Sequence, residues 1–125
     1  MSLVTLRRVL VLIALLTVVS GLVQAVAPGV LLALLSADAT PTSRHFFGIV
    51  GMFMVLFGGM LWHALAAGGP QPVPILWAAL QKLGASLAVG LGVWNGIFSP
   101  LALGVAGFDL LSGVLALVYW RAVSR

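Results

Sequence analysis

The sequence predicts an all-α integral membrane protein, an antiparallel four-helix bundle with both termini in the cytoplasm. Of its 125 residues, 62% are hydrophobic and only 6% are charged, whereas about a quarter of the residues in soluble domains are charged. The mean hydropathy is +1.25. Because crossing about 30 Å of hydrocarbon takes roughly 20 apolar residues, residues 1–125 are expected to form one transmembrane domain with four spans.

The first two spans are expected at residues 9–35 and 44–67. Pro28 and Gly29 are predicted to bend or interrupt the outer end of the first span. The intervening segment 36–43 is rich in Ser, Thr and Pro, which are the residues that cap a helix and start its first turn. This segment therefore predicts the start of the second helix.

The third and fourth spans are expected at residues 75–98 and 101–120. Three prolines in segment 68–74 break the helix before the third span. Ser99 and Pro100 predict a tight turn between the two spans. Tyr119 and Trp120 lie at the end of the fourth span, where aromatic belts form at membrane surfaces.

The basic residues near the span ends indicate the topology. Arg7, Arg8, Arg121 and Arg125 lie on one side, and Arg44 lies alone on the other. The positive-inside rule places the side with more Lys and Arg in the cytoplasm. Short connections make consecutive spans antiparallel, so an up-down-up-down bundle is expected.

Three charges in or beside the spans are the main functional clue, because an intramembrane charge persists where it faces protein, water or a partner charge. At about 100° per residue, Asp109 shares its helix face with small residues. These are Ala102, Ala106, Ser112, Gly113 and Ala116, while Leu111, Val114, Leu115 and Val118 lie opposite. Lys82 likewise shares its face with Ala78, Ala79, Ala85, Ser86 and Val89, opposite Leu80, Leu87, Leu91, Trp94 and Phe98. Both charges are expected to point inward.

The other two spans contribute further polar positions to this expected interior. Arg44 heads a stripe with Gly48, Gly51, Val55, Gly58, Gly59, Trp62 and Ala66, while Phe46, Phe53, Met54, Phe57 and Leu61 turn away. In the first span Thr17, Ser20 and Gln24 follow one another at one-turn spacing. Hydroxyls in spanning helices often bond their own backbone, so Gln24 is the stronger candidate. The predicted polar cluster is Gln24, Arg44, Lys82 and Asp109.

The cluster has two cations for one anion, and the residues leave its meaning open. Lys82 is placed about 10 Å from the cytoplasmic surface and Asp109 about 12 Å from the outer one, so Asp109 is within reach of either cation. A structural ion pair that fixes helix register is one interpretation. Otherwise Lys82 is neutral, Arg44 is solvated at the rim, or the interior accepts the anionic or polar head of a lipid or quinone.

Small residues also predict close helix contacts. The positions are Gly48, Gly51 and Gly58 in the second span, Gly84, Gly92 and Gly96 in the third, and Gly113 in the fourth. Gly84, Ala88, Gly92 and Gly96 recur every fourth residue, a ridge suited to a neighbouring helix or to another protomer.

Several classes of function are excluded or disfavoured. The chain has no cysteine, which excludes disulfides and thiolate metal sites. No catalytic, metal-binding or nucleotide-binding motif occurs, so no enzyme activity and no catalytic or metal-ligating residue is expected. The basic residues flank the spans and predict no nucleic-acid partner. His45 and His63 lie five turns apart on one face, which resembles the spacing of two haems stacked in a helix bundle. A haem on either histidine requires a partner chain for its second axial ligand, so no cofactor is expected.

The chain resembles the small four-helix bacterial membrane proteins called DoxX-like. The features are the Arg44-led second span ending in Ala-Ala, Gln-Lys-Leu-Gly at 81–84 and Phe-Asp-Leu-Leu at 108–111. The resemblance implies a multi-pass protein of the bacterial inner membrane with an accessory or redox-linked role. We therefore expect a non-catalytic accessory or assembly subunit, partnered by membrane lipids and by a larger complex or copies of itself. The alternative is a lipid-binding, quinone-binding or transport protein that uses the polar cluster.

Overall fold

The computed structural model describes residues 1–125 and contains five helices and no strand. They are α1 (Leu3–Val26), α2 (Pro28–Leu34), α3 (Pro41–Ala66), α4 (Pro72–Trp94) and α5 (Ala102–Val123). All except α2 are long and apolar enough to cross a membrane. The expected all-helical fold is confirmed, and four of its helices are long and apolar enough to be the four expected spans.

The segment predicted as the first span, residues 9–35, is divided between two helices. The Ser2 hydroxyl accepts a hydrogen bond from the Thr5 amide at 3.1 Å, so α1 begins before the predicted residue 9. The helix ends at Val26, and Pro28 starts α2 in the first-turn position that suits proline. The predicted interruption at Pro28 is confirmed.

The α3 helix begins at Pro41, three residues before the expected start. Thr40 and Ser43 form a capping box in which each side chain accepts a hydrogen bond from the backbone N–H of the other. Pro41 occupies the first turn. The Ser, Thr and Pro residues of the preceding segment therefore provide the capping that their composition predicts.

The α4 helix ends at Trp94, and the expected end at residue 98 is corrected. Gly96 has a φ of +73°, which a residue with a side chain rarely adopts. The Ile97 amide donates to the Gly92 carbonyl at 2.8 Å and the Gly96 amide to the Val93 carbonyl at 3.0 Å, the pattern of a Schellman motif. Gly96 consequently lies in the turn after α4 and not on a helix-packing ridge.

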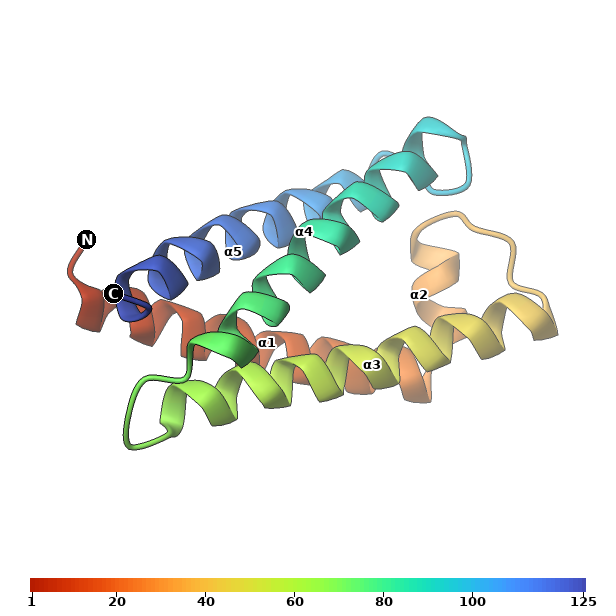
Figure 1. Ribbon diagram of the computed structural model, residues 1–125. Helices are drawn as coiled ribbons and strands as arrows, with labels where there is room; N and C mark the ends of the chain where they lie inside the picture. Colours follow the sequence, from red (N-terminus) through yellow and green to blue (C-terminus); the bar gives the residue numbers. More distant parts are fainter.

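The spans associate in two pairs. Helix α1 packs mainly along α3, and α4 packs mainly along α5. The two pairs lie close together at the end that carries both termini and diverge toward α2 (Figure 1). At the diverging end the Ser99 amide donates to the Leu35 carbonyl at 2.8 Å, which ties the end of α2 to the connection between α4 and α5.

The hydrophobic core lies between the pairs at the end with the termini. Its members come from the first half of α1, the end of α3, the start of α4 and the end of α5. They are Leu6, Leu10, Ile13, Ala14, Leu61, Ala64, Leu65, Ile75, Ala78, Ala79, Ala116 and Tyr119. Toward the middle of the molecule this apolar core gives way to the polar residues described next.

Candidate functional site

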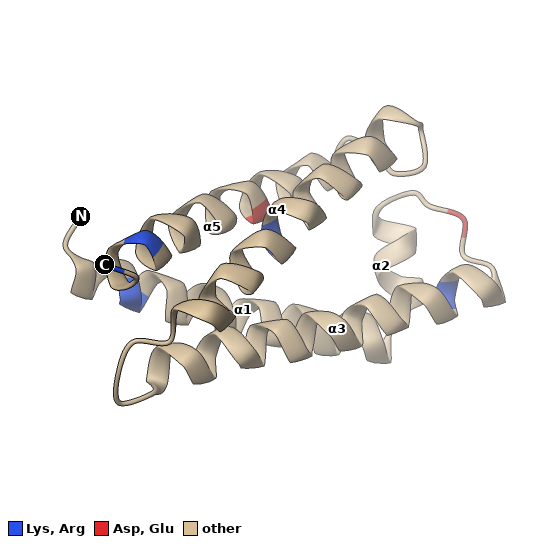
Figure 2. Cartoon of the chain, in the orientation of Figure 1, with Lys and Arg blue, Asp and Glu red and all other residues tan.

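Lys82 and Asp109 form an ion pair inside the molecule. The Lys82 ammonium lies 3.3 Å from Oδ1 of Asp109, and the two residues are 5% and 9% exposed. The pair joins α4 to α5 midway along both helices, where their charged residues lie side by side in Figure 2. The structure therefore brings together two of the four predicted cluster residues.

Lys82 also reaches a third helix. Its ammonium donates a hydrogen bond to the Thr17 hydroxyl at 2.6 Å, and Thr17 in turn donates to the Ile13 carbonyl at 2.8 Å. Each of the four spans packs against two others, but α1 and α4 make no close backbone contact. They face each other across the bundle, and the long Lys82 side chain bridges them.

Two further contacts surround this ion pair. The Phe108 ring centroid lies 5.4 Å from the Lys82 ammonium, within the range of a cation–π interaction. The Ser86 hydroxyl donates to the Ala106 carbonyl at 2.8 Å and provides a second polar link between α4 and α5. The charge of Lys82 is thus stabilised by a carboxylate, a hydroxyl and an aromatic face.

The polar residues form a layer next to the apolar core, on the side away from the chain termini. Thr17 follows core residue Ile13 by one turn, and Lys82 follows Ala79 by one turn. Ser112 lies on the buried face of α5, and its hydroxyl has no hydrogen-bond partner. The layer contains a cation and its counter-ion, and the contacts of Lys82 join the three helices α1, α4 and α5.

The predicted inward faces of the two charged helices agree with the structure. On α5 the buried residues are Ala102, Ala106, Asp109, Ser112, Gly113, Ala116 and Tyr119. On α4, Ala78, Ala79 and Lys82 are buried, while Leu80, Leu87, Leu91 and Trp94 are exposed. The prediction for α3 is wrong near its end, because Leu61 is 2% exposed and Trp62 is 49% exposed. Near the end of α3, the buried face is the one that carries Leu61 and contacts the hydrophobic core.

Arg44 and Gln24 do not join the Lys82–Asp109 pair. Gln24 is buried and donates from Nε2 to the Phe47 carbonyl at 3.0 Å, which joins α1 to α3. Arg44 is exposed near the start of α3, at the end of the molecule away from the termini (Figure 2). The expectation of one interior with Asp109 between two cations is therefore corrected, because the diverging helix pairs separate Arg44 from Asp109.

The predicted packing glycines fall into two groups. Gly51, Gly58 and Gly113 are buried against a neighbouring helix, Gly48 has the end of α1 and Pro28 nearby, and Gly92 accommodates the Phe98 ring. A Cβ on Gly84 meets no atom within 4 Å. Sequence reasoning missed Gly21, whose added Cβ lies 2.6 Å from the Gly51 carbonyl oxygen. Gly21 follows Thr17 by about one turn and so lies on the same face of the first span, and this position could have predicted a helix contact.

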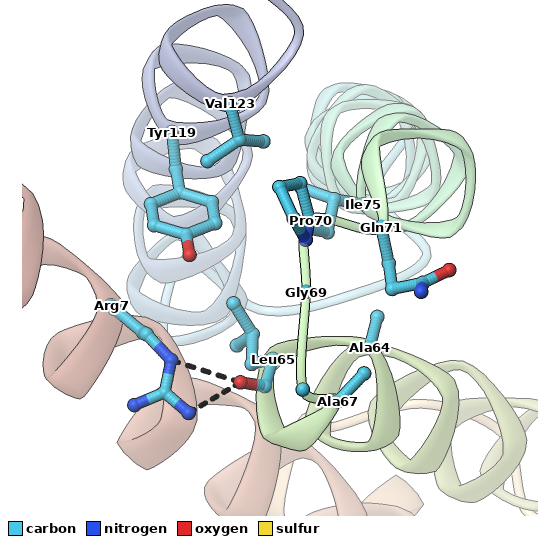
Figure 3. A pocket seen from close by; sticks show the side chains of 11 residues that line it. Arg7, Ala64, Leu65, Ala67, Gly69, Pro70, Gln71, Ile75, Tyr119 and Val123 are labelled. Atoms are coloured by element: carbon cyan, nitrogen blue, oxygen red, sulfur yellow. Dashed lines mark hydrogen bonds between the residues drawn. The ribbon is translucent and has the colours of Figure 1, made fainter.

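Sequence reasoning also missed a second role of Arg7. Its guanidinium donates from Nε and Nη2 to the Leu65 carbonyl in the last turn of α3. Figure 3 shows these two bonds beside a cavity of about 180 Å³, with the Tyr119 hydroxyl pointing toward them. Arg7 thereby satisfies a helix-end carbonyl, and no sequence pattern identified this acceptor.

Comparisons with protein families, curated proteins and solved structures find no match to this chain. The resemblance to DoxX-like proteins stays a prediction.

Proposed function

We propose that this protein is a non-catalytic integral membrane protein that serves as an accessory or assembly subunit of a larger membrane complex. The observation that carries the proposal is a difference between the two helix pairs. Four of the five glycines of α1 and α3 have neighbours within the chain, whereas four of the six glycines of α4 and α5 face open space; Gly59 in the first pair and Gly92 and Gly113 in the second are the exceptions.

The glycines of α1 and α3 other than Gly59 already have partners. An added Cβ on Gly21, Gly51 or Gly58 approaches backbone atoms of the opposite helix to 3.0 Å or less. On α4 and α5, by contrast, Gly84, Gly104 and Gly107 are exposed, and an added Cβ meets no atom within 4 Å. Small residues on a spanning surface let another helix approach closely. The outer surface of α4 and α5 therefore suits a partner helix.

The state of the buried charges supports the same role. Lys82 and Asp109 neutralise each other and join α1, α4 and α5. This contact within the chain is compatible with an accessory role, in which the two charges bind no ligand and catalyse no reaction. The alternative, lipid or quinone binding or transport at a shared Arg44, Lys82 and Asp109 cluster, loses its support. Arg44 lies away from the other two charges.

We further propose an antiparallel arrangement with both termini in the cytoplasm of a bacterial cell. Both chain ends lie at one end of the molecule together with Arg7, Arg8, Arg121 and Arg125 (Figure 2). Arg44 and the acidic Asp38 lie toward the other end. This asymmetry of Lys and Arg supports the proposed orientation.

The test is purification in a mild detergent followed by native mass spectrometry. We expect a stoichiometric complex with another membrane protein, whereas an assembly made only of copies of this chain would contradict the accessory role. Gly107→Leu should abolish the complex while the monomer melts as before, because its added side chain has open space. Gly59→Leu on α3, whose surroundings are equally open, should leave the complex intact. A wild-type chain that is a bare monomer, or equal loss of the complex in both variants, contradicts the proposal.

A further inference from the structure

A groove opens on the surface where α1 ends and α3 begins. Its volume is about 560 Å³, and its lining includes Pro28, Arg44, His45, Gly48, Ile49 and Met52. Neither the core nor the Lys82–Asp109 pair contributes a residue to it. The groove is therefore a separate feature of the molecule.

Arg44 gives this groove an unneutralised positive charge. The only ion pair in the chain joins Lys82 to Asp109, and no acidic residue lines the groove. The Arg44 side chain lies over Gly29, where an added Cβ comes within 3.2 Å of Nε. The small residue at 29 leaves room for this position. A guanidinium with free N–H groups is suited to bind a phosphate through two parallel hydrogen bonds.

The groove changes from polar to apolar along the helix axis. Arg44 and His45 lie in the first two turns of α3, next to the end of the span. Met52 lies eight residues beyond Arg44, which corresponds to about 12 Å along a helix. Ile49 and Gly48 lie between them. A charged end at the membrane rim and an apolar floor at the depth of the acyl chains match the two parts of a phospholipid.

We propose that this groove binds an anionic phospholipid, with its phosphate on Arg44 and part of an acyl chain along Gly48, Ile49 and Met52. His45 supplies a further polar group beside the phosphate. The inference is independent of the accessory role, because the groove lies on α1 and α3 whereas the open glycines lie on α4 and α5. Either conclusion can fail without the other.

The experiment is native mass spectrometry of the purified chain with phosphatidylglycerol or phosphatidylcholine added in a mild detergent. We expect preferential retention of phosphatidylglycerol. Arg44→Gln should lower that retention about tenfold or more, the factor that corresponds to loss of a charge-assisted hydrogen bond. Arg8→Gln, an exposed arginine at the opposite end of the molecule, should leave retention unchanged.

A second variant keeps the charge and fills the groove. A Cβ on Gly48 makes only ordinary contacts, at 3.6 Å from the Ala25 carbonyl oxygen and 3.8 Å from Pro28 Cγ, so Gly48→Leu should fold. It should lose retained phosphatidylglycerol, whereas Gly59→Leu should keep it. Inorganic phosphate in large excess should not displace the lipid. The proposal is overturned if Arg44→Gln or Gly48→Leu retains the lipid like wild type, or if inorganic phosphate alone displaces it.

Discussion

The ammonium of Lys82 lies 2.6 Å from the hydroxyl oxygen of Thr17, and this hydrogen bond connects two helices whose backbones make no close contact. The same ammonium is paired with Asp109 on a third helix. A shorter side chain on α4 does not span the bundle. The residue therefore needs length as well as charge, which accounts for a lysine in the middle of an apolar helix.

Removing Lys82 should destabilise the protein strongly. Lys82→Met leaves Asp109 buried without a partner, and breaking a buried ion pair in this way costs about 3–5 kcal/mol. Leu87→Ala, at a position that is 66% exposed on the same helix, should cost much less. Unfolding curves in detergent measure both free energies.

The double variant Lys82→Met/Asp109→Leu provides the control for this prediction. It removes both charges at once, so it should be more stable than either single variant. Wild-type melting of both single variants would rule out a stabilising ion pair.

The hydroxyl of Thr17 should contribute a smaller amount. Thr17→Val keeps the shape of the side chain but removes the acceptor of the Lys82 hydrogen bond, at a cost of about 1 kcal/mol. Thr17→Ser should retain most of the stability, and Ser20→Ala, at an exposed position, should have no effect. The same unfolding measurement applies, and equal stability of the valine and serine variants would contradict the role assigned to the hydroxyl.

The inward faces of Lys82 and Asp109 were predictable because small residues surround them on their own helices. A helical projection gives the direction of a side chain around one helix. It does not say which helix lies opposite, and this is why the Lys82–Thr17 contact could not be predicted. The sequence predicts that the Thr17 hydroxyl bonds its own backbone, and in the structure it does this while it also accepts a hydrogen bond from Lys82.

The position of Arg44 could not be predicted from the sequence for a different reason. A helical projection treats its stripe on α3 as continuous, but the helix pairs diverge toward α2 and the contacts of α3 change along its length. Gly51 packs on α1, whereas Leu61 faces the shared core. A single projection over residues 44–67 cannot represent such a change, and it therefore predicts that Trp62 faces inward.

The contact between α1 and α3 should tolerate no added methyl group at Gly21. A Cβ there lies 2.6 Å from the Gly51 carbonyl oxygen and 2.9 Å from the Val55 amide nitrogen. Gly21→Ala forces the helices apart and should cost about 1–3 kcal/mol. Gly59→Ala should instead be neutral or stabilising, because its surroundings are open and alanine favours the helix. Unfolding free energies of the two variants should have opposite signs relative to wild type, and equal signs would contradict this contact.

The proposed orientation can be checked with introduced cysteines, because the chain has none of its own. Ala39 lies in the connection before α3, and Gly69 lies in the connection before α4; both are exposed. In intact cells a membrane-impermeant maleimide should label Ala39→Cys and leave Gly69→Cys unlabelled until the membrane is opened. The reverse pattern would mean that the termini lie outside.

The last turn of α2 should become more stable when Ser36 is replaced by glycine. Ser36 has a φ of +56°, and its amide donates to the Ala33 carbonyl while the Ala37 amide donates to the Leu32 carbonyl. Gly96 occupies the equivalent position in the Schellman motif after α4, with a φ of +73°.

Relief of the left-handed conformation should make Ser36→Gly about 0.5–1 kcal/mol more stable, after allowance for the greater freedom of glycine in the unfolded chain. Gly96→Ser should lose a similar amount, although its Cβ meets no atom within 4 Å, because the backbone conformation alone opposes it. Thermal unfolding of the two variants measures both effects. A lower melting temperature for Ser36→Gly, with Gly96→Ser unchanged, would show that backbone strain does not determine the stability of these two turns.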